Sequence, residues 1–485
     1  MSISSALSTA LTGLTASSRM AEVTASNISN ALTEGYARRE LTLSPRVLGQ
    51  SGLGVSVGGV TRHVNLALLQ DLRLSSASEG AASPIADVLG RIEQAYGVPD
   101  QPGSLSGRIA RFEKSLLDAA SRPDSDARLT AVADAANFLT DGLNAASDAV
   151  QSERQRADIA IASEVKRVND ALQGVADLNI RIRAFKSAGR DTSGLMDQRQ
   201  QLIDSISTAI PLREVARDHD QVALYTSAGT NLLDGRPAKL EFSTTGTITA
   251  DMTIGSGALS GLTINGQPVT TSPSGGRLGE GGLSALFGIR DDIAPRLQQQ
   301  IDALARDLIG RVASPSVDPS LAPGASGLFT DGGGAFDPPD EAGLAGRISV
   351  NALVRPDMGG AVWRLRDGIG AAAPGSPGNG TLLSALSTAL ATARIPASGG
   401  FSPGQHTLSD LAGKVLSNTS VQRLQAETEA SFAAARSDGL RSEMLRDGVD
   451  TDQEMQTLLL IEQAYAANAK VIQTVDGLLE IVLGL

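Results

Sequence analysis

The sequence predicts a mainly α-helical, elongated protein of several domains. Terminal heptad helices pair as a coiled coil, the middle of the chain is a long helical domain, and a small β domain is inserted into it. Both ends of the 485-residue chain carry a heptad repeat, and no proline occurs between Pro123 and Pro211. Aromatic residues make up only 3% of the chain, which favours slender helices over a thick core, because aromatics supply much of the buried area per residue.

A 4-3-4-3 spacing of apolar and small residues predicts the first helix. It should end near Asn30, because Gly35 supplies a left-handed turn position, and a small hairpin with strands at 37–43 and 54–60 should follow. From the spacing alone, an intermolecular seam and an ordinary amphipathic helix packed on its own domain are about equally favoured. The positions of this seam are Ile3, Leu7, Ala10, Leu14, Ser17, Ala21, Thr24 and Ile28.

Heptad stripes in residues 125–185 predict a helix or helix pair of up to ~90 Å at 1.5 Å per residue. Residues 213–277 are rich in Thr, Ser, Gly and Val, and Asn265-Gly266 is a hairpin-type turn signal, so a small β domain is expected there. Other helices are predicted at 194–210, 282–312, 381–393 and 408–446, with loops at 313–342 and 371–380.

The last segment carries a second, bulkier seam with 3-4-3-4 spacing. Asn468 occupies one of its positions, where a polar residue often fixes the register of a coiled coil. We expect the two terminal helices to pair with each other and with neighbouring copies, as in a polymer whose termini build an inner tube. The positions of this seam are Leu458, Ile461, Tyr465, Asn468, Ile472, Val475, Leu479 and Val482.

These patterns predict three domains. Residues 1–30 and 452–485 form a terminal coiled-coil domain. Residues 31–212 and 281–451 form a helical core domain with a short β-hairpin, and residues 213–280 form the inserted β domain.

Composition argues against several classes of function. The net charge of −12 disfavours binding to nucleic acid, and the longest aliphatic runs are far too short to insert into a membrane. With no Cys and three scattered His, we expect no metal site, and no cofactor motif occurs. The N-terminus has neither a basic segment nor an apolar run of the kind found in cleavable secretion signals.

A short segment matches the motif of a catalytic nucleophile. Residues Gly54 to Gly58 match the Gly-x-Ser-x-Gly pattern of hydrolase nucleophile elbows, which require a sharp strand-to-helix turn. The alternating valines here favour a continuous strand, so we expect no catalytic residues and no enzyme activity.

Motifs at both ends resemble flagellar axial proteins. Residues Ser26 to Arg38, with Asn27-Ile28-Ser29-Asn30 and then Gly35-Tyr36, look like the N-terminal motif of that family, and in particular of its hook-associated protein 1 branch. At the other end, Glu454-Met455, Gln463 to Tyr465 and Ala469 to Asp476 are similar to the C-terminal signature. Residues 195–199 and 281–291 also resemble the branch. Glu34 and Ala37 depart from it, since Pro and Ser are frequent at these positions.

The resemblance implies a structural subunit of the bacterial flagellum at the hook–filament junction. Such a protein is exported by the flagellar type III system without signal cleavage and is therefore extracellular after a cytoplasmic stage. The implied partners are further copies of the chain in a ring, the flagellar hook protein, hook-associated protein 3 and an export chaperone. Another flagellar axial protein, of the rod or hook, is the alternative.

Because the β insert carries no seam, we expect it to be dispensable for junction formation. The assembly and chaperone interface is expected at Ile3, Leu7, Leu14, Ile28, Leu458, Ile461, Tyr465, Asn468, Ile472, Val475, Leu479 and Val482.

Overall fold

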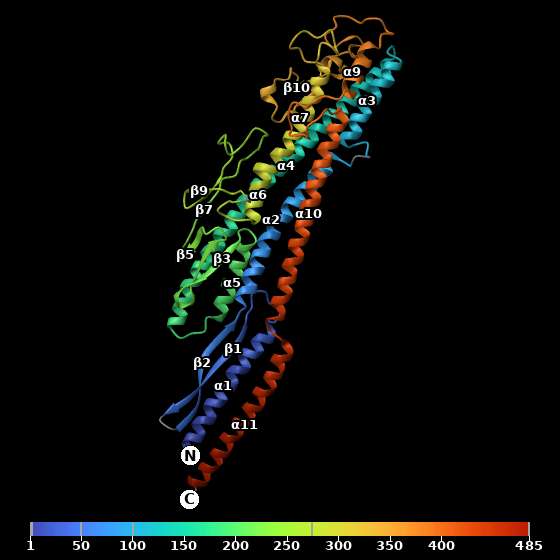
Figure 1. Ribbon diagram of the computed structural model, residues 1–485. Helices are drawn as coiled ribbons and strands as arrows, with labels where there is room; N and C mark the ends of the chain where they lie inside the picture. The colour runs from blue at the N-terminus through green and yellow to red at the C-terminus, as the bar shows by residue number, and fades with distance from the viewer. Residues whose placement is uncertain (1–2, 49–50, 99–100, 273–274, 484–485) are drawn as a thin grey trace.

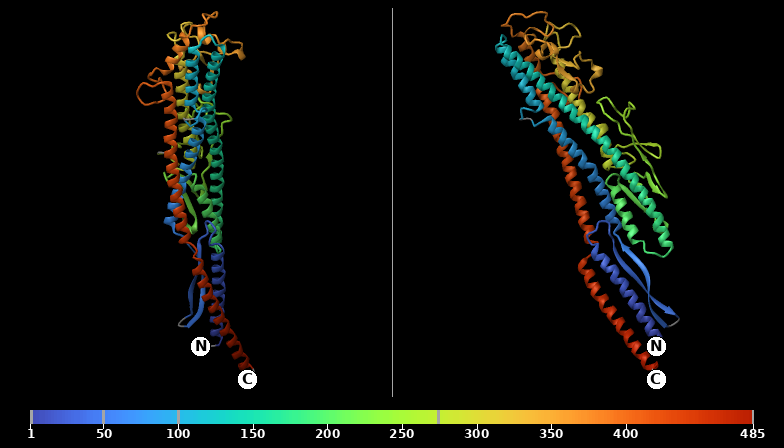
Figure 2. Two further views of the ribbon diagram at one scale, coloured as in Figure 1. Left: turned by 90° about the vertical axis from the view of Figure 1, so that its right-hand side faces the viewer. Right: turned by 180° about the vertical axis from the view of Figure 1, so that it is seen from behind.

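The computed structural model describes residues 3–48, 51–98, 101–272 and 275–483. The chain forms a long rod (Figures 1 and 2), with both termini at one end and the loops between 313 and 405 at the other. The predicted fold class is confirmed: long helices dominate, and the strands in the described ranges form four small antiparallel sheets. None of the described helices combines the length and the apolarity needed to cross a bilayer.

The helices match the sequence patterns closely. The predicted helix at 125–185 is one continuous helix of 62 residues, α4, and the predicted helix at 408–446 has those bounds as α10. The prediction omitted α2 and α3, which occupy most of residues 66–121. The helices are α1 (Ile3–Ser29), α2 (Leu66–Tyr96), α3 (Leu105–Ser121), α4 (Asp126–Ser187), α5 (Ser193–Ser207), α6 (Gly282–Gly288), α7 (Ala294–Val312), α8 (Arg364–Asp367), α9 (Thr381–Ala391), α10 (Leu408–Arg446) and α11 (Thr451–Leu483), with a π turn at Ile289–Ile293 between α6 and α7.

The strands are short except for one long hairpin. β1 pairs with β2 in that hairpin, β3 to β6 form a second sheet, β7 to β9 a third, and β10 pairs with β11. Their bounds are β1 (Arg38–Leu48), β2 (Ser51–His63), β3 (Leu212–Ala216), β4 (Val222–Thr226), β5 (Asn231–Asp234), β6 (Arg236–Pro237), β7 (Leu240–Glu241), β8 (Leu262–Ile264), β9 (Gln267–Val269), β10 (Phe329–Asp331) and β11 (Ile348–Val350).

Two hydrophobic cores lie along α4. Its first half packs on α2, α3 and α7, and residues of α9 and α10 belong to the same core. Its second half, from Ile161 to Ala176, shares a core with α5, Phe287 and apolar side chains of β3, β4, β5, β7 and β8. Removal of residues 213–280 would uncover that half of α4. This shared core argues against the expectation that the β insert is dispensable.

A buried ion pair also anchors the insert. Asp158 of α4 and Arg290 of the π turn are both fully buried, with Oδ1 and Nη1 2.7 Å apart. Arg290 Nη2 donates to the carbonyl of Ser260 in the insert, and Arg154 donates to the carbonyls of Thr249 and Met252. Charged groups so deep in a protein are stable only when paired and hydrogen-bonded in this way.

Another buried carboxylate holds the turn at 343–346 against α7. Asp302 accepts hydrogen bonds from the backbone N–H groups of Gly343 and Ala345, each at 2.8 Å, and from Gln298 Nε2 at 2.9 Å. Burial raises the pKa of Asp302 from 3.8 to about 6, although these hydrogen bonds act in the opposite direction. The folded chain therefore binds a proton at this site more tightly than the unfolded chain does.

This raised pKa predicts a pH-dependent contribution to stability. Proton uptake at Asp302 favours the folded state, so the contribution is fully present below about pH 4 and is lost as the pH rises through about 6. The difference corresponds to about 3 kcal/mol. Replacing Asp302 by Asn should remove this dependence, so thermal melts of wild type and variant should diverge between pH 4 and 7. The exposed Asp340→Asn serves as the control, and parallel profiles for wild type and Asp302→Asn would contradict the prediction.

Candidate assembly site

The two terminal helices pair with each other within the chain. α1 and α11 run antiparallel side by side, beyond the end of the helical body (Figures 1 and 2). The structure thus brings together the two seams that the heptad spacing predicted. On α1, Ala10, Ser17 and Thr24 are buried, and the other seam positions are half-buried.

The inner seam of α11, which faces α1, consists of the predicted positions on that helix. Ile461 and Val475 are buried, whereas Tyr465 is 45% exposed. Leu458, Asn468, Ile472 and Leu479 are half-buried, and the side chain of Val482 lies outside the described part.

Small residues on α1 let the two helices approach closely. A Cβ atom added at Gly13 would lie 2.8 Å from the side chain of Asn468, so this glycine makes room for that amide. Asn468 Nδ2 donates to the carbonyl of Ala464 on its own helix, at 3.0 Å. The side chain of Asn468, the polar residue of the α11 seam, thus lies against Gly13 of α1. That this contact fixes the register stays a prediction.

The hairpin lies against α1, on a different side from α11. Along β1, Leu41, Leu43 and Val47 alternate with polar residues, and Leu43 faces Val57 across the ladder. Near the tip, the N–H of Val55 donates to Thr12 Oγ1 at 3.3 Å. We call α1, the hairpin and α11 together the terminal module. The predicted division assigned this hairpin to the helical core domain, and its packing on α1 favours placing it with the terminal helices instead.

The predicted nucleophile-elbow match lies in this hairpin. Gly54 to Gly58 belong to strand β2, which continues to His63. The strand interpretation is confirmed.

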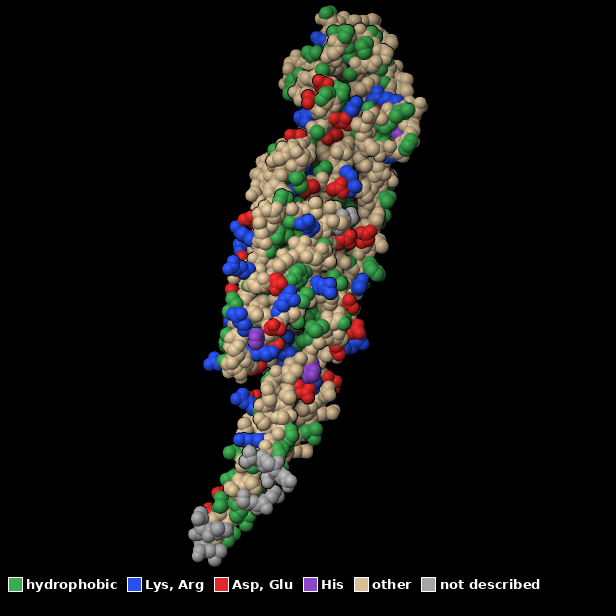
Figure 3. Space-filling view, turned by 60° about the vertical axis from the view of Figure 1, so that its left-hand side comes forward, with side chains coloured by type: hydrophobic (Ala, Val, Ile, Leu, Met, Phe, Trp, Pro, Cys, Tyr) green, Lys and Arg blue, Asp and Glu red, His purple; other side chains and the backbone are tan. Residues whose placement is uncertain are grey.

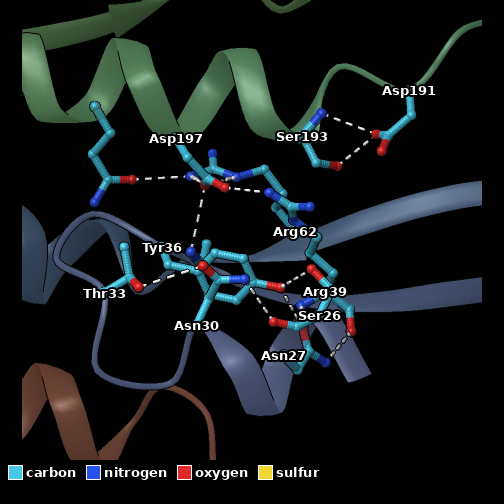
Figure 4. A network of polar contacts seen from close by, with 12 residues as sticks. Ser26, Asn27, Asn30, Thr33, Tyr36, Arg39, Arg62, Asp191, Ser193 and Asp197 are labelled. Atoms are coloured by element: carbon cyan, nitrogen blue, oxygen red, sulfur yellow. Dashed lines mark hydrogen bonds and ion pairs between the residues drawn. The ribbon is translucent and has the colours of Figure 1, made fainter. Parts of the chain in front are cut away.

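Asn27 joins α1 to the hairpin (Figure 4) and also contacts α11. Its side-chain amide donates to the carbonyl of Arg39 at 2.8 Å, and its Oδ1 accepts from the N–H of Arg39 at 3.0 Å and from the hydroxyl of Tyr36 at 2.8 Å. Asn27 Nδ2 also donates to Glu454 Oε2 at 3.1 Å. The other carboxylate oxygen of Glu454 accepts from Arg38 Nε at 2.7 Å.

Asp197 of α5 ties the hairpin to the helical body. Its Oδ2 accepts from Arg39 Nη2 at 2.5 Å, and its Oδ1 accepts from Arg62 Nη2 at 2.6 Å and Nε at 2.9 Å. All three side chains are mostly buried. We call Asn27, Tyr36, Arg38, Arg39, Arg62, Asp197 and Glu454 the joint network, because they connect the terminal module to the body.

Gly35 permits the turn that positions the side chains of the joint network. Its φ of +77° lies in the left-handed region, and a Cβ atom there would lie 2.6 Å from Gln201 Cγ of α5. The N-terminal motif therefore has a physical role in this chain. Asn27, Gly35 and Tyr36 fix the path of the chain as it leaves the end of α1 and passes along α5.

A second apolar stripe on α11 was missing from the sequence prediction. Residues 460, 464, 467, 471, 474, 478 and 481 repeat with 4-3-4-3-4-3 spacing and carry no charge. At 100° per residue, this outer stripe lies about a third of a turn from the inner seam. Leu460 and Ile481 are 66% and 64% exposed, and Val471 and Leu478 are nearly half exposed. The outer stripe consists of Leu460, Ala464, Ala467, Val471, Thr474, Leu478 and Ile481.

The site consists of contact surfaces on α1, the hairpin and α11. Within the described ranges, no group of three or more His, Asp or Glu side chains is arranged to hold a metal ion. The sequence-predicted interface residues with described side chains lie where α1 meets α11. Their part in assembly or chaperone binding stays a prediction.

Comparisons with known proteins point to one family. Residues 89–314 match the helical domain of the flagellar hook-associated protein FlgK, and residues 445–485 match the C-terminal segment of the flagellar basal body rod FlgEFG proteins. The Bacillus subtilis flagellar hook-associated protein 1 is 24% identical, across 98% of this chain and 97% of its own length. The protein of that name from Salmonella typhimurium is 25% identical, across 49% of this chain and 44% of its own length.

Among solved structures, the flagellar hook junction protein FlgK from Burkholderia pseudomallei is similar with a TM-score of 0.44 and 17% identity. The alignment covers 54% of this chain and 47% of that one.

Proposed function

Because the chain belongs to the flagellar hook-associated protein 1 (FlgK) family, we propose that it is a structural subunit of the bacterial flagellum that forms the junction between hook and filament. The match over residues 89–314 distinguishes it from rod proteins, whose match is confined to residues 445–485. The role is structural rather than catalytic. Nearly full-length similarity to the Bacillus subtilis relative supports the assignment.

The outer stripe of α11 is the observation that carries an assembly role. The inner seam is already covered by α1, yet the helix presents a second heptad stripe to solvent along most of its length. Large apolar side chains in a continuous exposed row mark a surface that binds another protein. A subunit whose inner seam is covered by its own α1, and whose outer stripe stays exposed, is suited to bind further copies.

We propose that copies associate through their terminal modules to form a ring on the hook. The neighbours along the flagellar axis are then the hook protein on one side and hook-associated protein 3 on the other. The chain reaches this extracellular position through the flagellar type III system. Before export, a chaperone covers α11, because an exposed apolar stripe invites self-association in the cytoplasm.

Deletion of the gene from its own bacterium tests this function. Electron microscopy of the deletion strain should show hooks without filaments, with filament subunits shed into the medium. Expression of the wild-type chain from a plasmid should restore attached filaments, and gold-labelled antibody should mark only the hook–filament boundary. Filaments attached normally in the deletion strain would contradict the proposal.

A further inference from the structure

One leucine stands almost fully exposed where the terminal module meets the body. Leu32 lies in the turn between α1 and the hairpin, and its side chain is 88% exposed. Among the described residues, no large apolar side chain is more exposed. On the face of the rod turned forward in Figure 3, charged side chains of both signs lie near the border between the narrow terminal segment and the body. An exposed leucine at this polar border calls for an explanation.

A pocket opens beside this turn. Its volume is about 350 Å³, and it lies between the turn, α2, α5 and the end of α10. Four large apolar side chains line it, and none of them is fully buried: Leu72 of α2, Met444 and Leu445 of α10, and Val449 just before α11. Contact of these side chains with water is unfavourable in proportion to their exposed area.

Both chain neighbours of Leu32 already border the pocket. Ala31 and Thr33 belong to its lining, so the backbone at Leu32 passes along the rim while the leucine side chain points away. The turn also faces α10 across the mouth of the pocket, where Glu34 Oε1 lies 4.0 Å from Arg441 Nε. Leu32 is therefore the large apolar side chain closest along the chain to the open pocket.

The turn is fixed at both ends but loosely held at its centre. Asn30 Nδ2 donates to the carbonyl of Ser26 at 2.9 Å, and Gln201 Nε2 donates to the carbonyl of Glu34 at 2.7 Å. Between them, the exposed N–H of Thr33 donates to the carbonyl of Asn30 at 2.9 Å. Water can replace this bond at little net cost.

The peptide groups of Leu32 itself are free to rotate. In the part of the chain that the structure describes, neither its N–H nor its carbonyl takes part in a hydrogen bond. A backbone rotation between the two fixed ends can therefore carry its side chain from solvent into the pocket, while the joint network stays in place.

We propose that residues 31–34 form a lid, which closes when the side chain of Leu32 enters the pocket. Closure buries Leu32 against Leu72, Met444 and Val449 and covers their exposed apolar area, which favours the closed state. The joint network ties the terminal module to α5, and closure adds an attachment to α2 and α10. The lid thus stiffens the joint between the terminal module and the body.

Tryptophan fluorescence of the purified chain can test the lid, because the chain contains one Trp. Replacing that residue, Trp363, by Phe gives a background without tryptophan. Leu32→Trp then places a single indole on the lid. Ser442→Trp, at an exposed position of α10 outside the pocket lining, is the matched control. Leu32→Trp/Ser76→Phe fills the pocket, because Ser76 belongs to its lining.

Leu32→Trp should emit at shorter wavelength than Ser442→Trp and should be quenched less by acrylamide, and the added Ser76→Phe should abolish both differences. Equal emission and quenching in Leu32→Trp and Ser442→Trp would overturn the proposal. A difference that persists in the filled pocket, or that grows with protein concentration, would place the indole elsewhere or against a second copy, and would overturn it too.

A second measurement keeps the native leucine. With the methionine methyl groups labelled with ¹³C, the signal of Met444, assigned with Met444→Leu, should move in Leu32→Ser. It should stay in place in Leu424→Ser, which removes another exposed leucine of the same region, on α10 itself. A Met444 signal that ignores Leu32→Ser would contradict the lid. Both measurements use the purified chain, so their outcome is independent of the proposed junction function.

Discussion

Replacing Val475 by Asp should abolish filament attachment. Val475 is buried in the inner seam of α11, 6% exposed against α1. A carboxylate at this position loses its hydration without gaining a partner, which costs several kcal/mol. Isolated helices are only marginally stable and depend on packing against a partner. We therefore expect this cost to separate α11 from α1.

Two measurements check this. Limited proteolysis of the purified variant should release residues 451–483 while the helical body stays intact, and the variant should restore no swimming in the deletion strain. Gln473→Asp introduces the same charge at an exposed position on the same helix, and it should behave like wild type. A Val475→Asp protein that resists the protease and supports motility would show that the pairing of α1 with α11 is unnecessary for assembly.

Replacing Asp197 by Ala should uncouple the terminal module from the body. Asp197 is the shared partner of Arg39 and Arg62, and its loss leaves two mostly buried guanidinium groups side by side. Breaking a buried ion pair by removing one partner typically costs about 3–5 kcal/mol. At about 1.4 kcal/mol per tenfold change, hydrogen exchange at the backbone amides of Ala37 and Arg39 should accelerate by at least about a hundredfold.

Two further variants make this result specific. Asp191→Ala removes an exposed carboxylate just before the same helix that contacts Ser193 rather than the arginines, and it should leave exchange at residues 37 and 39 unchanged. Adding Arg62→Ala to Asp197→Ala should recover part of the protection, because one of the two orphaned cations is then removed. Unchanged exchange in Asp197→Ala would mean that packing, and not the joint network, holds the hairpin to α5.

The terminal pairing could be predicted because heptad spacing is a local property of the sequence. The inner seam of α11 and the seam of α1 follow directly from it. The same segment contains a second heptad, displaced by one position, whose residues are on average smaller than those of the inner seam. Only the observed packing on α1 shows which of the two rows is covered.

The joint network could not be predicted from spacing. Asp197 lies 158 residues from Arg39 and 135 from Arg62, and its neighbours form an ordinary amphipathic helix. The resemblance identified Asn27, Tyr36, Asp197 and Glu454 as parts of motifs without saying that they meet. Their shared role depends on the turn at Gly35, which directs the chain back onto α5.

The sequence prediction omitted α2 for a different reason. This helix contains Pro84 and a run of small residues at 75–78, which weaken its apolar periodicity. It is held by packing along α10 rather than by its own pattern. The β insert was recognised from composition, but the core that it shares with α4 depends on tertiary contacts that composition does not show.

The pairing of the first helix with the last sets the order in which the molecule is completed. Asn27 and Glu454 touch although 427 residues separate them. During synthesis, or during passage through a narrow channel from N- to C-terminus, α1 emerges long before its partner exists. Contacts between such distant segments form slowly, because the intervening chain must first be brought together. In a truncated or unfinished chain the seam of α1 therefore stays uncovered, and the terminal module closes only on a finished subunit.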